Sequence, residues 1–210
     1  MLFRSPRDHP EFSAISNDGD LVVAREETKD GAGLFASRRG EGGWDQETLL
    51  TGDSPYPYNE LPAISEDGAT VLFACGSTPY AQEGTGLCEV GTDGAGFRVV
   101  LAPEDGPGGT ADSSLRMADY MPWGGIVFEA DWAGEQIWTQ AAGGAPSLLA
   151  GTFFNDNSPC ALPGAIASLW LDRPDGQGYH EIKISSPDGA TWFMLLQDVD
   201  VMDIGIGCSK

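Results

Sequence analysis

Short apolar runs separated by glycine-rich polar turns follow one another along the whole chain. Two of these runs, Leu21–Ala24 and Thr70–Ala74, are rich in β-branched or aromatic residues, and each begins within two residues after an Asp-Gly pair. Such runs predict β-strands, and the Asp-Gly pairs predict two-residue hairpin turns that need positive φ. No window of a dozen residues has the apolar spacing of an amphipathic helix without a Gly or Pro inside it. The pattern therefore predicts an all-β protein with very little helix.

A repeat of about 50 residues organises these strands. The segment Ala14-Ile-Ser-Asn-Asp-Gly19 matches Ala63-Ile-Ser-Glu-Asp-Gly68, and strand-like runs of similar length follow each copy. Four short antiparallel strands per repeat is the periodicity of a β-propeller blade. Two more divergent units align with the first two when Ala118 and Cys160 are placed in register with Ala63.

The repeat predicts one β-propeller domain over residues 1–210, with about four four-stranded antiparallel blades. We expect the blades to span residues 12–59, 60–112, 113–156 and 157–197, with a closing inner strand in 198–210. Closure into a ring removes the exposed strand edges that otherwise invite aggregation. A self-contained ring is therefore favoured over a piece of a larger propeller.

The repeat resembles the TolB-like, or PD40, propeller repeats, which are WD40-like. Their unit reads approximately as Pro, a small residue, an apolar residue, Ser, any residue, Asp and Gly, followed by an apolar strand. Residues 62–68 keep this unit nearly intact, and residues 13–19 depart from it at one position. The resemblance implies the fold but leaves the function open, because such propellers serve as binding platforms, enzyme domains and assembly scaffolds.

The chain is strongly acidic, with 32 Asp and Glu against 11 Lys and Arg and a formal net charge of −21. This charge argues against nucleic-acid binding and against attachment to an anionic membrane surface. No apolar run approaches the ~18 residues of a membrane span, so we expect no membrane insertion.

Phosphate-binding glycine loops are absent, which argues against a nucleotide cofactor. The first ten residues lack the apolar core of a signal peptide, which leaves a cytoplasmic protein or a mature or truncated form of an exported one.

Function in propellers usually gathers around the central channel, where the innermost strands begin. The predicted register brings four carboxylates together at this channel mouth, those of Glu11, Glu60, Asp156 and Asp203. Neighbouring carboxylates repel one another unless they are neutralised, so we predict a divalent cation there, either Ca²⁺ or a transition metal. The alternative interpretation is that these are solvated turn residues, since Asp favours turns for backbone reasons alone.

Two histidines are candidate catalytic residues. His9 lies near the predicted acidic cluster, and His180 begins a strand in the fourth unit. Together with a metal-activated water and a carboxylate base, either histidine would support an ester or phosphoester hydrolase. A hydrogen bond on the blade surface explains His180 equally well, so the sequence leaves enzymatic activity undecided.

Aromatic side chains in predicted loops suggest a different function. Tyr56, Tyr58 and Trp132 lie in such loops, where an exposed ring can stack on a small molecule or grip a peptide. The alternative is that these rings fold back onto their blades. The leading functional interpretation is a propeller platform that binds a protein or small-molecule ligand across one face, and the metal-dependent hydrolase is the alternative.

The four cysteines form two candidate pairs. Cys75 and Cys88 flank the connection between two neighbouring strands of the second unit, and Cys160 and Cys208 occupy equivalent positions on successive inner strands. Each pair is either a disulfide, which requires an oxidising compartment, or two buried thiols.

Overall fold

Alternating apolar positions and glycine turns fold this chain into four small antiparallel sheets, which we call blades 1 to 4. The computed structural model describes residues 13–152, 156–171 and 180–199. Blade 1 contains β1 (Ser13–Ile15), β2 (Leu21–Thr28), β3 (Gly31–Gly40) and β5 (Thr48–Leu49), and β4 (Gly43–Trp44) pairs with the end of β3. Blade 2 contains β6 (Tyr58–Ile64), β7 (Thr70–Gly76), β8 (Gly86–Gly91) and β9 (Arg98–Leu101). Blade 3 contains β10 (Leu115–Tyr120), β11 (Ile126–Ala130), β12 (Gln136–Gln140) and β13 (Ser147–Leu148). Blade 4 contains β14 (Asp156–Leu162), β15 (Ala165–Leu171), β16 (His180–Ser185) and β17 (Trp192–Val199).

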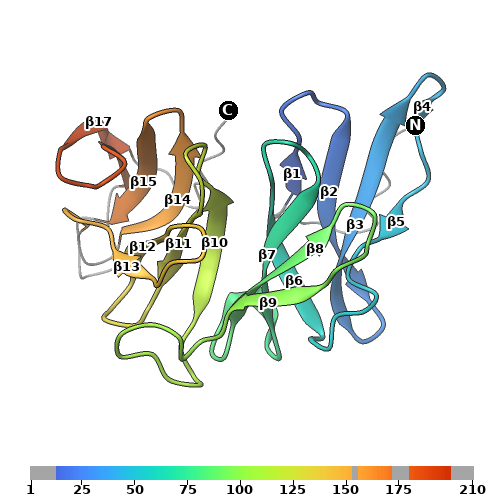
Figure 1. The fold of residues 1–210 in the computed structure, drawn as a ribbon, viewed down its shortest axis with the longest axis horizontal. Helices are drawn as coiled ribbons and strands as arrows, with labels where there is room; N and C mark the ends of the chain where they lie inside the picture. The colour runs from blue at the N-terminus through green and yellow to red at the C-terminus, as the bar shows by residue number, and fades with distance from the viewer. Residues whose placement is uncertain (1–12, 153–155, 172–179, 200–210) are drawn as a thin grey trace.

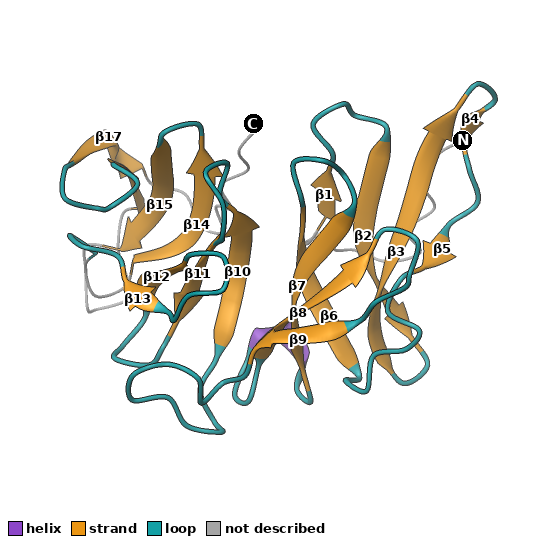
Figure 2. Cartoon of the chain, viewed as in Figure 1, coloured by secondary structure: helices purple, strands orange, loops and turns teal. Residues whose placement is uncertain are grey.

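The blades follow one another in sequence order across the molecule (Figure 1). Blades 1 and 2 are joined by one parallel pair between Ala32 and Tyr58, and blades 3 and 4 are separate sheets. The only helical segment among the described residues is the short 3₁₀ turn η1 (Pro79–Ala81), drawn in purple in Figure 2. The predicted all-β architecture of about four four-stranded blades is confirmed.

The second and third strands of blades 2 and 3 each contribute to two hydrophobic cores, because alternate side chains of a strand point to opposite faces. On β7, Val71, Phe73 and Cys75 pack with residues of blade 1, whereas Leu72 packs with residues of blade 3. Strand β11 repeats this arrangement: Phe128 packs with residues of blade 2, whereas Val127 packs with residues of blade 4. Burial on both faces explains the apolar runs Val71–Cys75 of β7 and Ile126–Phe128 of β11.

Blade 1 has one face without a neighbouring blade among the described elements. Val22 and Ala24 of β2 lie on this face, in register with Ile15 of β1 and Phe35 of β3. Ile15 is 63% exposed, and the other three side chains are half-buried. The packing between blades runs from blade 1 to blade 4 in sequence order, and strand pairing does not close the four sheets into a ring within the described ranges.

The predicted self-contained ring is therefore not formed by the residues that the structure describes. Residues 198–199 of the predicted closing strand belong to β17, and residues 200–210 lie outside the described ranges. Placement of the whole chain in one domain stays a prediction.

The Asp-Gly turns are longer than the sequence analysis predicted. Between β6 and β7, the Ser65 hydroxyl donates to Asp67 Oδ1 at 2.6 Å, and the Ala69 amide donates to the same oxygen at 3.0 Å. The Gly68 amide donates to the Ser65 carbonyl at 2.9 Å. Gly68 has φ +68°, while Asp67 does not have positive φ. The prediction of a two-residue hairpin turn was wrong because the aspartate accepts hydrogen bonds from the turn instead of adopting a left-handed conformation.

The same Ser-x-Asp-Gly turn occurs twice more, at residues 16–19 of blade 1 and residues 186–189 of blade 4. In both places the serine hydroxyl and a backbone amide donate to the aspartate, with distances within 0.1 Å of those at residues 65–69. These hydrogen bonds, of which the serine bond is the strongest influence, lower the pKa of the three aspartates below 3.8. The same turn therefore joins the first two strands of blades 1 and 2 and the last two strands of blade 4.

We expect the Asp67→Ala variant to unfold at a lower urea concentration than the wild type at pH 7. Because the pKa of Asp67 is lower in the folded state, its contribution is complete above the unfolded value of 3.8 and is lost as the pH falls through the folded value. The difference between variant and wild type should therefore shrink at pH 3. Glu66→Ala, an exposed neighbour, is the control, and an unchanged difference at pH 3 would contradict this role.

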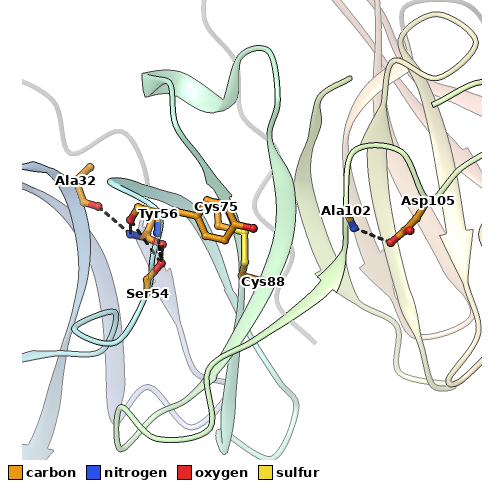
Figure 3. The surroundings of a disulfide bond; sticks show 8 residues. Ala32, Ser54, Tyr56, Cys75, Cys88, Ala102 and Asp105 are labelled. Carbon is orange, nitrogen blue, oxygen red and sulfur yellow. Dashed lines mark hydrogen bonds between the residues drawn. A yellow bond between two sulfur atoms is a disulfide. The ribbon is translucent and has the colours of Figure 1, made fainter. Parts of the chain in front are cut away.

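A buried disulfide joins neighbouring strands of blade 2. Cys75 of β7 and Cys88 of β8 are bonded, with their Cα atoms 5.9 Å apart, and both face blade 1. Tyr56 lies beside this bond (Figure 3). The sequence left open whether Cys75 and Cys88 form a disulfide or remain two buried thiols, and the structure contains the disulfide. Cys160 is also disulfide-bonded, and Cys208, its predicted partner, lies outside the described ranges.

Replacing both Cys75 and Cys88 by Ala should lower the free energy of unfolding by about 2–4 kcal/mol, since the bond closes a short loop in the unfolded chain. Urea denaturation of oxidised protein measures the loss, and under reducing conditions, where the Cys160 bond is broken as well, wild type and variant should differ much less. Reaction of Cys75 and Cys88 with a thiol reagent in denatured, unreduced protein would contradict the disulfide.

Candidate functional site

The inner strands of blades 2, 3 and 4 each contain a β-bulge near their beginning. Leu61, Met117 and Ser158 have φ values of 56°, 49° and 48°, and the strand register shifts at each of them. Left-handed conformation is unfavourable for such residues, and bulges and backbone strain often occur next to functional sites. The bulges mark the end of the propeller where the inner strands begin, which we call the inner-strand end.

The bulges also correct the predicted alignment of the repeats. Ala63 and Cys160 follow their bulge residues by two positions, and in blade 3 this position is Asp119. Ala118, which the sequence placed there, is one residue out of register. The alanine resembles its counterparts in size, but pairing with the second strand determines the register.

A buried ion pair joins blades 1 and 2 at the inner-strand end. Arg25 Nε of β2 donates to Glu60 Oε1 of β6 at 3.1 Å, and the Glu60 side chain is only 1% exposed. The other carboxylate oxygen accepts a hydrogen bond from the Ala81 amide at 3.0 Å. Both oxygens of Glu60 are therefore occupied by protein groups.

Blades 3 and 4 meet through a second buried carboxylate. Glu129 of β11 accepts from Arg116 Nε at 2.6 Å and from the amide of the bulge residue Ser158 at 3.3 Å. Burial raises the pKa of Glu129, while the Arg116 guanidinium opposes that rise. Asp119 adds a further contact between these blades by accepting from the Ala161 amide at 2.9 Å.

Arg25, Ala74 and Glu129 occupy equivalent positions on the second strands of blades 1, 2 and 3. At this position blade 2 has an apolar contact in place of a charged one. Ala74 packs in a cluster with Leu61 and with Met117, the bulge residue of blade 3. Each second strand thus contacts the bulged part of the next blade. Charged groups make this contact twice, and apolar groups make it once.

Asp156, at the start of β14, is buried with a lysine. Lys183 Nζ of β16 donates to Asp156 Oδ2 and to the Gly151 carbonyl, the latter at 2.7 Å. Thr152 also donates to Asp156 Oδ2, at 3.1 Å. Lys183 lies 5.9 Å from the centre of the Trp192 ring. The lysine neutralises the aspartate inside blade 4.

The structure places two of the four predicted cation ligands, and it does not bring them together. Glu60 is paired with Arg25, and Asp156 is paired with Lys183 in a different blade. Glu11, Asp203 and His9 lie outside the described residues, and the side chain of His180 is not described either. Among the described residues, no group of three or more His, Cys, Asp or Glu side chains could hold a metal ion. The cation site therefore stays a prediction.

The predicted ligand-binding aromatics have three different environments. Trp132 is buried, donates to the Pro103 carbonyl at 2.5 Å and lies edge-on to Trp138, so it folds back onto its blade and is not available to a ligand. Tyr56 is half-buried against Phe97 and the core between blades 1 and 2. Tyr58 is half-buried at the start of β6, at the inner-strand end.

An exposed aromatic that sequence reasoning missed lies on η1, which packs against β6. Tyr80, in the connection between β7 and β8, is 51% exposed and has φ +61°. The Arg25 guanidinium lies 5.6 Å from the centre of its ring. The signal in the sequence was a Pro-Tyr pair in a polar loop, which is weak because many loop tyrosines fold back.

The backbone beside Tyr80 is fixed from two blades. Its neighbour Ala81 donates its amide hydrogen to the buried Glu60 carboxylate. Ser114, from the segment that leads into blade 3, donates its hydroxyl to the carbonyls of Ala81 and Gln82, at 2.5 and 3.0 Å. The Cys75–Cys88 disulfide closes the base of the same loop. Tyr80 is thus an exposed ring on a rigid backbone.

A shallow pocket of about 280 Å³ lies elsewhere, at the outer rim between blades 1 and 2. It is lined by Ala36, Arg38, Asp45, Gln46, Thr48, Thr92 and Asp93. Arg38 already donates to Thr92 across it, at 2.6 Å, so the basic side chain of this pocket is engaged within the protein.

Solved structures with the same arrangement of blades identify the fold. The protein assigned as TolB in Agrobacterium tumefaciens matches 88% of this chain with a TM-score of 0.70 and 16% identity, over 64% of its own length. The fold is that of a TolB-like β-propeller. TolB from Acinetobacter baumannii matches with a TM-score of 0.63 and 17% identity, covering 88% of this chain and 42% of its own. The propeller domain of the trilobed protease from Pyrococcus furiosus, described as having an open velcro topology, matches at 0.51 and 12% identity, over 90% of this chain and 57% of its own.

The likeness to TolB concerns the fold alone, because the identities are low. No family model matches the sequence, and neither does the sequence of any curated protein. The chain spans less than two thirds of the length of the TolB structures that it matches. No helix among the described residues is long and apolar enough to cross a membrane.

We expect Arg25→Met to lower the free energy of unfolding by about 3–5 kcal/mol, because it leaves the buried Glu60 carboxylate without its cation. Adding Glu60→Gln should recover part of this loss, since the glutamine still accepts from the Ala81 amide. Arg98→Met breaks the exposed pair with Glu89 and should cost less than about 1 kcal/mol. Urea denaturation of the three variants, including the double one, measures these energies; equal losses in the Arg25 and Arg98 single variants would contradict the role of the buried pair.

Proposed function

We propose that this TolB-like propeller is a binding platform and that its ligand is a protein segment that docks at the inner-strand end, with Tyr80 as the anchor. The observation that carries the proposal is the contrast between the exposure of the Tyr80 ring and the fixed backbone beneath it. Glu60 and Ser114 bind the backbone of its neighbour Ala81 from two blades. Tyr58 begins β6, the strand that contains Glu60.

A fixed, exposed tyrosine is well suited to binding. Aromatic anchors contribute much of the binding energy at protein interfaces, and a ring that is already held loses little conformational entropy when the partner docks. The left-handed backbone at Tyr80 costs of order 1–3 kcal/mol, and such strain persists where surrounding contacts enforce it, commonly at functional sites. The contacts of Glu60 and Ser114 support this interpretation.

The solved relatives support a platform without selecting a ligand. They include TolB and the propeller domain of a protease, so the same fold is part of proteins with different roles. We therefore base the proposal on Tyr80 and not on what these proteins bind or cleave. The cation at the channel mouth and the metal-dependent hydrolase stay predictions, which elemental analysis and a hydrolase substrate panel with and without chelator will test.

Selection of 12-residue peptides from a phage-displayed random library tests the proposal. Wild-type protein should enrich a related set of peptides, and Tyr80→Ala should retain them at least about tenfold less well, the factor that corresponds to about 1.4 kcal/mol. Trp123→Ala is the matched control, because Trp123 is an exposed aromatic in the β10–β11 turn at the opposite end of the blades. Equal retention by wild type and Tyr80→Ala would reject the site, as would a loss of the same size in Trp123→Ala. Unchanged urea midpoints in both variants show that folding is preserved.

A further inference from the structure

Charges around Tyr80 restrict what kind of peptide fits there. Arg25 is the basic group beneath the ring, but its Nε donates to Glu60 and its side chain is only 11% exposed. Its positive charge is therefore already neutralised and largely covered. A partner that approaches Tyr80 does not meet a free cation at Arg25.

Three exposed acidic residues lie on or beside the elements that hold Tyr80, within the part of the chain that the structure describes. Glu27 is 79% exposed, and its Oε1 lies 4.0 Å from Arg25 Nη1. Glu83 is exposed on the same connection as Tyr80, and its carbonyl accepts from the Thr78 hydroxyl at 2.9 Å. Asp112 is also exposed. It lies beside the same connection, since its backbone carbonyl accepts a hydrogen bond from the Gly84 amide. An aromatic ring is thus presented among carboxylates.

We infer that the partner at Tyr80 is a basic peptide segment, in which an arginine or lysine side chain stacks on the Tyr80 ring and pairs with Glu27. This inference rests on the proposed function and specifies its ligand. A guanidinium is planar, stacks on aromatic rings and pairs with carboxylates, so it uses both features of the site. The net charge of −21 adds long-range attraction for a basic partner and opposes acidic segments and nucleic acids.

Fluorescence anisotropy with labelled 12-residue peptides tests this assignment at 150 mM salt. The probes are a peptide of alternating Arg and Gly, the same peptide with Glu in place of Arg, and a neutral Ser-Gly peptide. The Arg peptide should bind the wild type at least tenfold more tightly than the other two.

Four single variants distinguish specific binding of the Arg peptide at Tyr80 from nonspecific electrostatic attraction of this peptide to an acidic protein. Tyr80→Ala and Glu27→Gln should each weaken binding of the Arg peptide about threefold to tenfold, within the range of one cation–π or ion-pair contact. Tyr80→Phe should keep the affinity, because the ring remains. Glu66→Gln removes one exposed carboxylate at the opposite end of β7 and should leave binding unchanged.

The outcomes distinguish this inference from the proposal on which it rests. If the acidic or neutral peptide binds in a Tyr80-dependent way, the platform stands and the basic partner is wrong. If Glu66→Gln weakens binding as much as Glu27→Gln, the attraction is nonspecific and the inference is overturned. Absence of any Tyr80-dependent binding would overturn both.

Discussion

None of these four small sheets can bury its own apolar faces, so the structure depends on packing between successive blades. Val71 and Phe73 of β7 need blade 1, and Leu72 of the same strand needs blade 3. This dependence explains the apolar runs in β7 and β11. It also fixes where polar chemistry is possible, because only the strand ends, the turns and the outer strands remain in contact with water.

The blade interfaces also contain charged groups at the inner-strand end. Arg25 and Glu129 occupy the same position in their blades, and each binds the bulged part of the next one. A buried charge without its partner is costly, so these two contacts penalise any other arrangement of the blades more than an apolar contact would. The same Glu60 that binds Arg25 also binds the Ala81 amide, so blade packing and the placement of Tyr80 share one carboxylate.

The local part of the fold was predictable from the sequence, and the site was largely not. The Ala-Ile-Ser-x-Asp-Gly repeat revealed the blades because turns and strand alternation are local properties. The ion pairs of Glu60 with Arg25 and of Asp156 with Lys183 join residues 35 and 27 positions apart, and no pattern indicates which acid meets which base. Trp132 and Tyr80 both lie in polar loops, yet one is buried and the other exposed, because the packing of neighbouring loops decides this.

The Ser-x-Asp-Gly turn has a consequence for how the chain folds. Its hydrogen bonds connect residues no more than five positions apart, at Ser16, Ser65 and Ser186 alike. Closing so short a loop costs little entropy, whereas the contacts between blades must close loops of tens of residues. Three hairpins can therefore form before their blades have neighbours. The slow step of folding should then be the stacking of preformed hairpins and not the choice of strand register.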